Sequence, residues 1–427
     1  MARYQQVIFD LDGTLTDSAP GIIASIKYAL KETGRPIPDE ALLRRFIGPP
    51  LAESFIKWCG MSVEDAIAAT IPFKKRYNTI GWQENRVFPG IRPLLQALKA
   101  EGCYLAVATG KPQDIACQVL EHFDLLKYFD AVAGPNDEEL HADKGALVRR
   151  VLRQSQSAAM VGDTPSDVLG GHANGISGIA VRYGYGVPTE LAAVSPDAVA
   201  DTVAELQRVL LDREVVGRGV FLSIEGLDGC GKTTQRGVMQ EIMTDFGFEV
   251  RLTREPGGCE LSEKIRELLL NKNNTQMTDT TEALLYAASR AQHVREVIRP
   301  ELALGHAVLS DRFVDSSLAY QGGGRELGVE TVWQYNEAAV GDCMPDITVY
   351  LDIDFETSLR RRFSASDPDR MERQGADFFR RSELAFAALT KRYPERFLVV
   401  DGRRSREEIA DELRARLPER LKGKGLI

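Results

Sequence analysis

The sequence predicts an α/β protein of two domains, each built on a parallel sheet flanked by helices. Three observations predict this fold class. The 427 residues exceed the size at which one hydrophobic core usually stops growing, so two domains of about 200 residues are expected. In both halves, short apolar runs alternate with segments of helical periodicity. Polar groups follow the apolar runs, which is where open α/β sheets place their chemistry.

Composition excludes several classes of protein. Hydrophobic content of 44% and charged content of 27% are typical of a soluble protein. The net charge of -9 argues against a surface that binds nucleic acid. The six cysteines have no C-x-x-C spacing, which favours reduced thiols. No signal-peptide pattern or membrane-spanning stretch is recognised, so we expect a cytoplasmic protein with no membrane partner.

A short linker separates the two predicted domains. A helical pattern (Val203, Leu206, Val209 and Leu210) ends just before the segment 212–219, and a new apolar run starts after it. We therefore predict one domain over 1–212 and a second over 217–427.

The first domain begins with a strand over 4–9 that ends in Asp10-Leu11-Asp12-Gly13-Thr14. Carboxylates this close need a cation. Three later segments also carry polar groups: the strand 104–108 is followed by Thr109-Gly110-Lys111, Lys144 precedes a helix, and the strand 158–161 ends in Gly162-Asp163, with Asp167 one helical turn further on.

Residues between about 16 and 85 interrupt the alternation of strands and helices. Their apolar positions have helical spacing, which predicts a helical cap over the site: Ile22, Ile23, Ile26, Leu30, Leu42, Leu43, Phe46, Phe55 and Ile56. Such a cap excludes water from a reaction. The loop 47–50, next to Arg45, is either a substrate-facing loop or a rigid connection between helices.

These motifs, in this order, resemble those of the haloacid dehalogenase-like hydrolases, with a cap and loop similar to the phosphoglycolate phosphatase-like branch. The resemblance implies a Rossmann-like core and a Mg²⁺-dependent phosphatase. It makes Asp10 the nucleophile that becomes an aspartyl-phosphate, and Asp12 the acid/base. Thr109 and Lys144 would bind phosphate, and Asp167 would be a supporting carboxylate. The implied metal site draws on Asp10, Asp12 and Asp163.

The second domain opens on a phosphate-binding pattern. After an apolar strand over 220–224 comes Gly226-Leu227-Asp228-Gly229-Cys230-Gly231-Lys232-Thr233-Thr234, followed by a helical pattern that Gly247 can close. Strand, glycine loop and helix stand in the required order. Backbone N–H groups of such a loop bind a phosphate chain, Lys232 adds a charge, and the hydroxyl of Thr233 can ligate Mg²⁺. We therefore predict an ATP site over 226–234.

The remaining elements of this half also end in polar groups. Strands are expected at 249–253, 307–310 and 345–352; the first is followed by Arg254-Glu255 and the second by Asp311-Arg312. Tyr286 and Arg290 lie four apart on one helix face. In order and spacing this half closely resembles thymidylate kinase, a P-loop kinase with a parallel sheet flanked by helices.

The resemblance implies an enzyme that makes dTDP from dTMP and ATP. Tyr286 would stack on thymine, with core packing as the alternative, and Arg290 would bond its carbonyl edge. Arg312 would clamp the acceptor phosphate, since a planar fork suits phosphate. The other implied roles are Asp311 at Mg²⁺, Asp228 and Arg254 at the reacting phosphates, Glu255 near the acceptor sugar or metal, and Ser317, Tyr320 and Gln321 in the nucleoside pocket.

Phosphoryl transfer needs a further cation at the moving group, and Gly229 stands where one branch of the family has an arginine. The candidate segment is 360–373, which resembles the mobile lid of the other branch, with a solvated helical face as the alternative. Arg370, after the helix-breaking residues 364–369, is the predicted transition-state arginine.

Together, the two halves predict a bifunctional enzyme that uses Mg²⁺ and ATP. The resemblance to thymidylate kinase further implies a homodimer formed through the kinase half. The first half would act on a small phosphomonoester such as phosphoglycolate. Two alternatives stay open for that half: a nucleoside 5′-monophosphatase, and a scaffold without catalysis, against which its complete motif set counts.

Overall fold

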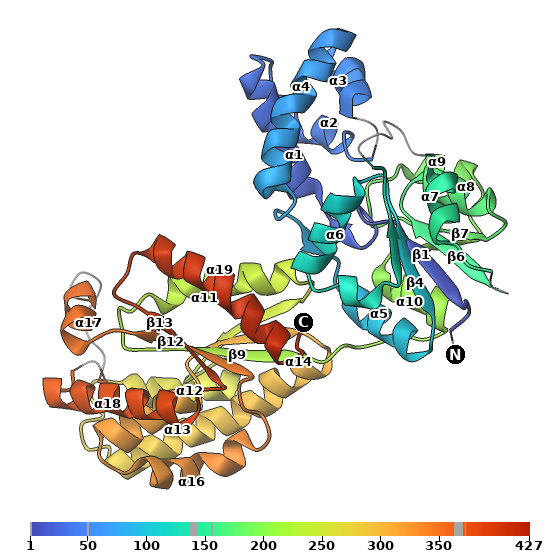
Figure 1. Ribbon diagram of the computed structural model, residues 1–427. Coiled ribbons are helices and arrows are strands. Elements are labelled where there is room, and N and C mark those ends of the chain that lie inside the picture. Colours follow the sequence, from blue (N-terminus) through green and yellow to red (C-terminus); the bar gives the residue numbers. More distant parts are fainter. Residues whose placement is uncertain (1, 49–50, 137–142, 155–156, 363–369, 372) are drawn as a thin grey trace. The chain divides into compact units, whose positions relative to one another are not determined.

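The computed structural model describes residues 2–48, 51–136, 143–154, 157–362, 370–371 and 373–427 (Figure 1). The chain divides into two compact units. The first extends to Val216 and includes Asp245–Gly247, and the second holds Gly217–Thr244 and Phe248–Ile427. Within the described ranges, no helix has the length and apolar character needed to cross a membrane. Each unit is an α/β fold with its own parallel sheet, which confirms the predicted fold class.

The first unit is built on a six-stranded sheet in the order β5-β4-β1-β6-β7-β8, in which all pairs are parallel. A two-stranded antiparallel pair, β2 with β3, lies outside it. The strands are β1 (Gln6–Phe9), β2 (Thr16–Asp17), β3 (Arg86–Val87), β4 (Tyr104–Ala108), β5 (Ala131–Ala133), β6 (Ala158–Gly162), β7 (Ser177–Val181) and β8 (Ala198–Ala200).

Helices cover this sheet and also form a separate cap. Apolar residues of β1, β4, β5 and β6 share a buried cluster with α7, which explains their continuous hydrophobic runs. The helices and helical turns of the unit are α1 (Ala19–Glu32), α2 (Glu40–Arg44), α3 (Leu51–Cys59), α4 (Val63–Arg76), η1 (Tyr77–Gly81), α5 (Ile91–Ala100), α6 (Gln113–His122), η2 (Leu126–Tyr128), α7 (Lys144–Val151), α8 (Pro165–His172), α9 (Pro188–Ala193) and α10 (Val203–Leu211).

The cap consists of α1 to α4 and η1, which lie between β2 and β3 in the chain. These helices bury a hydrophobic cluster of their own, with Ile23 and Ile26 of α1 packed against residues of the other three helices. Figure 1 shows the four helices grouped beyond one end of the six-stranded sheet. The helical periodicity of this region is therefore explained by a small bundle rather than by packing on the sheet.

The second unit is built on a five-stranded parallel sheet in the order β10-β11-β9-β12-β13. Its central strand β9 is buried along its whole length, as expected for a strand covered on both faces. The strands are β9 (Val220–Glu225), β10 (Val250–Arg254), β11 (Ala307–Asp311), β12 (Ile347–Asp352) and β13 (Phe397–Asp401).

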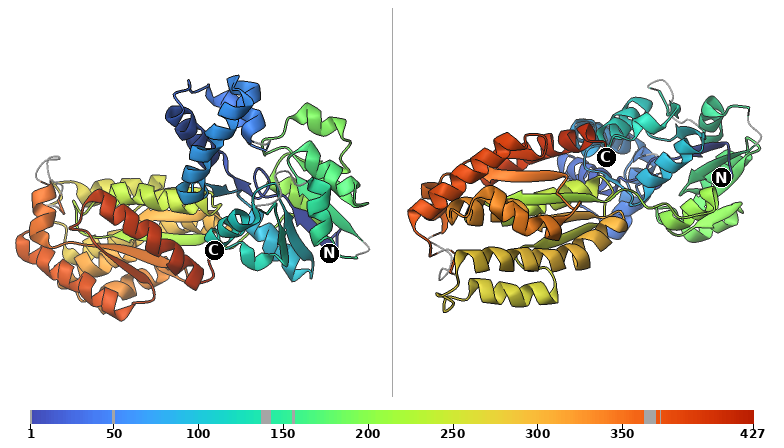
Figure 2. Two further views of the ribbon diagram at one scale, coloured as in Figure 1. Left: turned by 45° about the horizontal axis from the view of Figure 1, so that its top comes forward. Right: turned by 90° about the horizontal axis from the view of Figure 1, so that it is seen from below.

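Helices flank both faces of this second sheet, as Figures 1 and 2 show, with α11 and α19 on one side and α12, α13, α16 and α18 on the other. They are α11 (Lys232–Asp245), α12 (Glu260–Leu270), α13 (Asp279–His293), η3 (Val294–Ile298), α14 (Arg299–Ala303), α15 (Val314–Ser317), η4 (Leu318–Gly324), α16 (Val329–Val340), α17 (Phe355–Arg362), α18 (Ala376–Arg392) and α19 (Arg406–Gly423).

Candidate active sites

The first candidate site lies where the three adjacent strands β4, β1 and β6 end. Phe9 of β1 pairs in register with Val107 of β4 and with Val161 of β6. The residues that follow these positions therefore emerge at one edge of the sheet. This brings Asp10, Thr109 and Asp163 together, although about 150 residues of sequence separate the first from the last.

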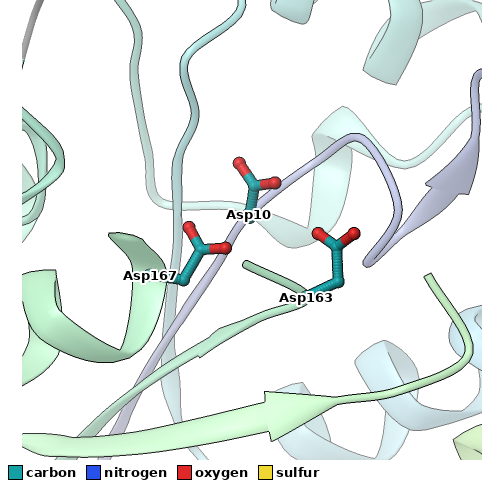
Figure 3. A group of neighbouring side chains, drawn as sticks. All are labelled: Asp10, Asp163 and Asp167. Carbon is teal, nitrogen blue, oxygen red and sulfur yellow. The ribbon is translucent and has the colours of Figure 1, made fainter. Parts of the chain in front are cut away.

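Three buried carboxylates converge at this edge: Asp10 directly after β1, Asp163 directly after β6, and Asp167 on α8 (Figure 3). Oxygen atoms of Asp10, Asp163 and Asp167 all lie within 4.8 Å of one another. Lys144, the first residue of α7, places its Nζ 2.8 Å from Asp10 Oδ1 and 2.7 Å from Asp167 Oδ1. Its side chain also donates to the carbonyl of Ala108, at 3.1 Å. The lysine therefore contacts the ends of β1 and β4 and the first turn of α8, three segments that are far apart in the sequence.

The carboxylates repel one another and are poorly solvated. Burial raises the pKa of Asp10 to about 6, with Lys144 opposing the rise and Asp167 adding to it. Burial, together with the charges of Asp10 and Asp167, raises the pKa of Asp163 to about 8. Three acids with one lysine leave an excess of negative charge, so the carboxylates favour either protonation or a cation.

Local backbone structure holds Asp163 in this cluster. Its Oδ2 accepts a hydrogen bond from Tyr185 N at 2.7 Å, and its Oδ1 lies 3.4 Å from Thr14 Oγ1. Gly13 has a φ of 84°, and a Cβ added there would lie 2.3 Å from Asp163 Oδ2. Only glycine therefore fits between the turn after β1 and this carboxylate.

The buried oxygen cluster fits Mg²⁺, because carboxylate oxygens are the protein ligands this ion prefers. Its members differ in part from the predicted metal ligands. Asp167, predicted only as a supporting carboxylate, belongs to the cluster, whereas Asp12 does not. Instead, Asp12 Oδ2 forms an ion pair with Lys111 Nζ at 3.0 Å.

Thr109 and the cap complete the surroundings of this site. Thr109 is buried and its Oγ1 accepts from Lys111 N at 3.2 Å. Gly48 of the cap loop approaches Thr164, since a Cβ built at Gly48 would lie 3.8 Å from Thr164 Cγ2. The loop predicted to face the substrate thus begins beside the carboxylate cluster; Pro49 and Pro50 lie outside the described residues, and Arg45 is exposed.

The second candidate site is the loop between β9 and α11. Gly226, Gly229 and Gly231 all have positive φ angles, and a Cβ at Gly226 would lie 2.7 Å from the carbonyl oxygen of Leu351. The glycines are therefore needed for the backbone path, as the pattern predicted. Lys232 begins α11, and Thr233 and Thr234 follow it as exposed residues on the first turn. The N-terminus of a helix attracts anions such as phosphate.

Two cations lie against this loop. Lys232 Nζ donates to the carbonyls of Gly226 and Leu227, at 3.0 and 3.1 Å. Arg312 donates to Gly226 O at 3.2 Å and to Asp228 Oδ1 at 2.5 Å. The side chain predicted to clamp the acceptor phosphate is thus in direct contact with the loop predicted to hold the donor phosphates.

A buried carboxylate shapes the turn that carries Arg312. Glu225 Oε1 accepts from Phe313 N at 2.7 Å, and its Oε2 accepts from Ser316 Oγ at 2.6 Å. Arg312 itself has a φ of 69°, which is rare for a residue with a side chain. Burial, with a further contribution from Asp315, raises the pKa of Glu225 to about 7. Glu225 has no predicted role because it lies between the predicted strand 220–224 and the phosphate-loop pattern, whereas in the structure it is the last residue of β9.

Arg290, predicted to contact thymine, is completely buried in a polar network. Its Nε donates to Glu255 Oε2 at 2.7 Å, and its other nitrogens donate to Asn336 Oδ1, the Phe313 carbonyl and Ser317 Oγ. The other carboxylate oxygen of Glu255 bonds His293 Nδ1 at 2.9 Å. Glu255 is therefore placed to orient Arg290, and in this structure it contacts an arginine and a histidine rather than an open space for a sugar or metal.

Tyr320 and Gln321 lie on η4, beside the phosphate-loop contacts. Tyr320 OH is 3.4 Å from Arg312, and its ring packs on Phe378 and Phe386 of α18. Gln321 donates to Glu282 Oε1 at 2.9 Å. Tyr286 is half-buried on α13, one helical turn before Arg290.

Two predicted phosphate contacts lie apart from the loop in this structure. Arg254 is exposed and pairs with Glu263 at 3.0 Å. Arg370 is buried; its NH1 is 2.7 Å from Glu282 Oε2, and its Nε donates to the Leu269 carbonyl at 2.7 Å. Residues 363–369 and Glu372 of the predicted lid lie outside the described residues. The lid therefore stays a prediction, and the structure describes only the segments at its two ends.

Comparisons with known proteins assign the two halves to two families. Residues 224–413 match the family model for thymidylate kinase, and residues 7–181 match that for haloacid dehalogenase-like hydrolases. Relatives of the second half include thymidylate kinases of Bacillus velezensis, 43% identical over 206 residues, and of Geobacillus thermodenitrificans, 45% identical over 207 residues. Each alignment covers 48% of this chain, and 97% and 92% of the respective relative.

Solved structures similar to the chain include a predicted phosphatase from Clostridium acetobutylicum, at 38% identity and a TM-score of 0.46, which covers 49% of this chain and 99% of that one. A haloacid dehalogenase-like hydrolase from Streptococcus pneumoniae has 31% identity and a TM-score of 0.45, with 48% of this chain and 98% of that one covered.

The order of the motifs, the two separate sheets and the matched ranges agree on how the chain is divided. The chain therefore belongs to the thymidylate kinase family through its second half, and this half is fused to a first half that matches the haloacid dehalogenase-like hydrolases.

Proposed function

We propose that the second unit transfers a phosphoryl group from ATP to dTMP and so makes dTDP. The observation that carries this proposal is the contact of Arg312 with Asp228 and with the Gly226 carbonyl, beside Lys232. An acceptor phosphate held by Arg312 would meet a donor phosphate held by the loop, as in-line transfer requires. The thymidylate kinases with which this half aligns support dTMP as the acceptor.

The direct test is ATP-dependent phosphorylation of dTMP, dUMP, dCMP and the ribonucleotide counterpart of dTMP by the purified full chain. The proposal expects the highest kcat/KM for dTMP. A chain that phosphorylates none of them, or prefers dCMP, contradicts it.

We infer that the first unit is a Mg²⁺-dependent phosphatase in which Asp10 attacks the substrate phosphorus. The supporting observation is a buried carboxylate at a strand end, 2.8 Å from Lys144 and within a three-carboxylate cluster. Asp10, Asp163 and Asp167 would hold the ion, which supplies charge neutralisation for an anion attacking an anionic phosphate. Lys144 adds a second positive charge at the same place.

The substrate of this half is proposed to be a small phosphomonoester such as phosphoglycolate. A panel of phosphoglycolate, dTMP, dUMP and pyrophosphate distinguishes it from a nucleoside monophosphatase. Highest kcat/KM for phosphoglycolate supports the proposal, and highest kcat/KM for dTMP or dUMP replaces it with the nucleotide alternative. Absence of Asp10-dependent phosphate release from every compound would leave this half without catalysis.

Removal of Mg²⁺ is predicted to destabilise the first unit more at pH 8 than at pH 6. A carboxyl whose pKa is raised in the folded state holds more protons there than in the unfolded chain. Without a cation, stability contributed by this cluster is therefore lost as the pH rises from about 4 toward the raised values near 6 and 8. A bound cation offsets that loss, and fewer protons compete with it at pH 8.

The measurement is thermal unfolding with Mg²⁺ or EDTA at both pH values. Trp58 and Trp82 lie in the first unit and Trp333 in the second, so a Trp333→Phe variant makes fluorescence report on the first unit. The Asp163→Asn variant should lose the Mg²⁺ effect, whereas Asp197→Asn, at an exposed carboxylate, should keep it. Equal Mg²⁺ stabilisation at pH 6 and pH 8 contradicts the prediction.

Arg370→Ala is predicted to lower kcat and kcat/KM for ATP together, by about tenfold or more, as for a contact made mainly in the transition state. In this structure that role requires Arg370 to exchange Glu282 and the Leu269 carbonyl for phosphate oxygens. Steady-state kinetics with dTMP saturating provides the test. Unchanged kcat with a lowered Tm would show Arg370 to be a structural ion-pair partner of Glu282.

The matched control for this experiment is Arg381→Ala on α18. Arg381 donates to the carbonyl of Gly324 and is less buried, so its loss removes an arginine from the same region without breaking the Glu282 pair. It should leave kcat for ATP within about twofold of the unmodified protein.

A further inference from the structure

Lys111 is a buried cation between the cap and the catalytic edge of the first sheet. Only 4% of its side chain is exposed. Its Nζ lies 3.0 Å from Asp12 Oδ2 and 2.5 Å from Tyr77 OH. A buried ammonium is costly unless it is paired, so these contacts fix its position.

The two oxygens of Asp12 have different environments. Oδ2 is paired with Lys111, whereas Oδ1 is buried and has no hydrogen-bond partner among the described residues. A buried carboxylate oxygen without a donor is uncommon and needs an explanation. The pairing of Oδ2 leaves Oδ1 as the oxygen that can exchange a proton with a reacting group.

Tyr77 connects the pair of Lys111 and Asp12 to the cap. It is the first residue of η1, where α4 ends and the chain turns back toward the core. Its ring stacks on Phe73 of α4, with ring centroids 5.4 Å apart, and Lys111 Nζ lies 4.7 Å from the centre of the Tyr77 ring. The tyrosine is therefore held by the cap while its hydroxyl accepts from a core lysine.

We propose that Lys111 is a positioning residue of the phosphatase reaction: seated against Tyr77 of the cap, it holds Asp12 Oδ2 so that Oδ1 is the proton-transferring oxygen. The inference rests on the proposed phosphatase function. In the first step an Asp10 oxygen bonds to phosphorus, the bond from phosphorus to the ester oxygen breaks, and a proton passes from Asp12 Oδ1 to that oxygen, which leaves as an alcohol.

In the second step water bonds to the phosphorus of the aspartyl-phosphate and gives a proton to Asp12 Oδ1. The bond between phosphorus and Asp10 then breaks, which releases inorganic phosphate and restores both carboxyl groups to their starting forms. A misplaced Asp12 would slow protonation of the departing oxygen, and that protonation matters most when the alcohol is a weak acid.

The test compares two substrates of the full chain that differ in their departing group. One is p-nitrophenyl phosphate, whose phenol leaves readily without a proton; the other is the best alkyl phosphate of the substrate panel. The quantity compared is kcat/KM, because it reports the steps up to the first bond cleavage. Lys111→Met, which removes the charge and shortens the side chain by one atom, should lower kcat/KM for the alkyl phosphate at least about tenfold more than for p-nitrophenyl phosphate.

A merely structural role for Lys111 would lower both values equally, so equal losses, or no loss, would overturn the proposal. A double-mutant cycle adds a second criterion: in the Asp12→Asn background, Lys111→Met should cause no further loss on p-nitrophenyl phosphate, because Lys111 acts through Asp12. Independent losses that multiply would show that Lys111 acts by another route.

Tyr77→Phe keeps the Lys111–Asp12 pair, so it remains informative even when Lys111→Met fails to fold. It should lower the ratio of kcat/KM for the alkyl phosphate to kcat/KM for p-nitrophenyl phosphate, as Lys111→Met does, but by a smaller factor of about twofold to fivefold. Tyr128→Phe is the matched control, because Tyr128 is a buried tyrosine whose hydroxyl accepts from Gln96 outside the site. If Tyr77→Phe and Tyr128→Phe gave the same ratio of the two kcat/KM values, the proposed contribution of the cap to the position of Lys111 would be contradicted.

One control distinguishes a failure of the proposed phosphatase function from a failure of the role proposed for Lys111. Loss of p-nitrophenyl phosphate hydrolysis in Asp10→Asn establishes that the measured activity belongs to this site. An Asp10-independent activity in the unmodified chain rejects the phosphatase proposal, whereas an Asp10-dependent activity with an unchanged substrate ratio in Lys111→Met rejects only the role of Lys111.

Discussion

Lys232→Ala is expected to lower kcat for dTDP formation by at least about a hundredfold, the order of loss seen when one electrostatic contact to the reacting group is removed. Lys232 begins α11, and its ammonium group lies within about 3 Å of two loop carbonyls and 3.6 Å from Asp228. With nucleotide present, that charge would turn from the carbonyls to the phosphate chain. The measurement is initial-rate dTDP formation with ATP and dTMP both saturating.

Lys264→Ala is the control for this loss of charge. Lys264 is an exposed lysine on α12 that pairs with Glu260 four residues earlier, so its removal should change kcat little. A Lys232→Ala protein that is folded and keeps kcat within a few fold of the unmodified chain would place the phosphoryl transfer elsewhere.

Asp10→Asn is expected to reduce phosphate release by the first unit at least about a thousandfold, because an amide cannot replace the attacking carboxylate. The same change removes one negative charge from a cluster of three, so the folded protein should not be destabilised by more than about 1 kcal/mol. Acid quenching during turnover should trap a hydroxylamine-sensitive phosphoenzyme in the unmodified chain and none in the variant.

Asp197→Asn again serves as the control, since Asp197 is exposed and pairs with His172 away from the cluster. Phosphate release by Asp10→Asn at the rate of this control would refute Asp10 as the nucleophile. A trapped phosphoenzyme in Asp10→Asn would assign the covalent step to another residue.

The parts of the sites that the sequence predicted are local to strand ends. The sequence predicts the positions of Asp10 after β1, Asp163 after β6 and the 226–234 loop after β9, because each of these strands is an apolar run. Parallel strands then bring their carboxyl ends to one edge, so motifs far apart in sequence were expected to meet. Lys144 needed the same reasoning, since it begins the helix that returns to that edge.

What could not be predicted depends on how helices pack on these edges. Nothing in the segment around Tyr77 indicates that its hydroxyl reaches Lys111, because that contact is set by how the cap returns to the core. Glu255 and Arg290 were assigned separate substrate contacts, yet the fold buries them as a pair. A buried ion pair leaves no pattern in a single sequence, because each partner reads alone as a surface charge.

The contacts of Arg370 could not be predicted from the sequence either. Its place after a helix-breaking segment favours a mobile phosphate contact, which stays a prediction; in this structure the arginine is buried against Glu282 of α13. The sequence showed a charge run, and the distinction between a solvated face and a buried pair lies in the tertiary contacts of α13 and η4.

We propose that one chain carries two phosphoryl-transfer sites, each built from residues of its own unit. The most direct measurement is both activities on both single-site variants: dTDP formation by Asp10→Asn and phosphate release by Lys232→Ala. We expect each variant to keep the other unit's activity within about twofold of the unmodified chain, because each site is built from residues of its own unit. Loss of both activities in either folded variant would contradict it.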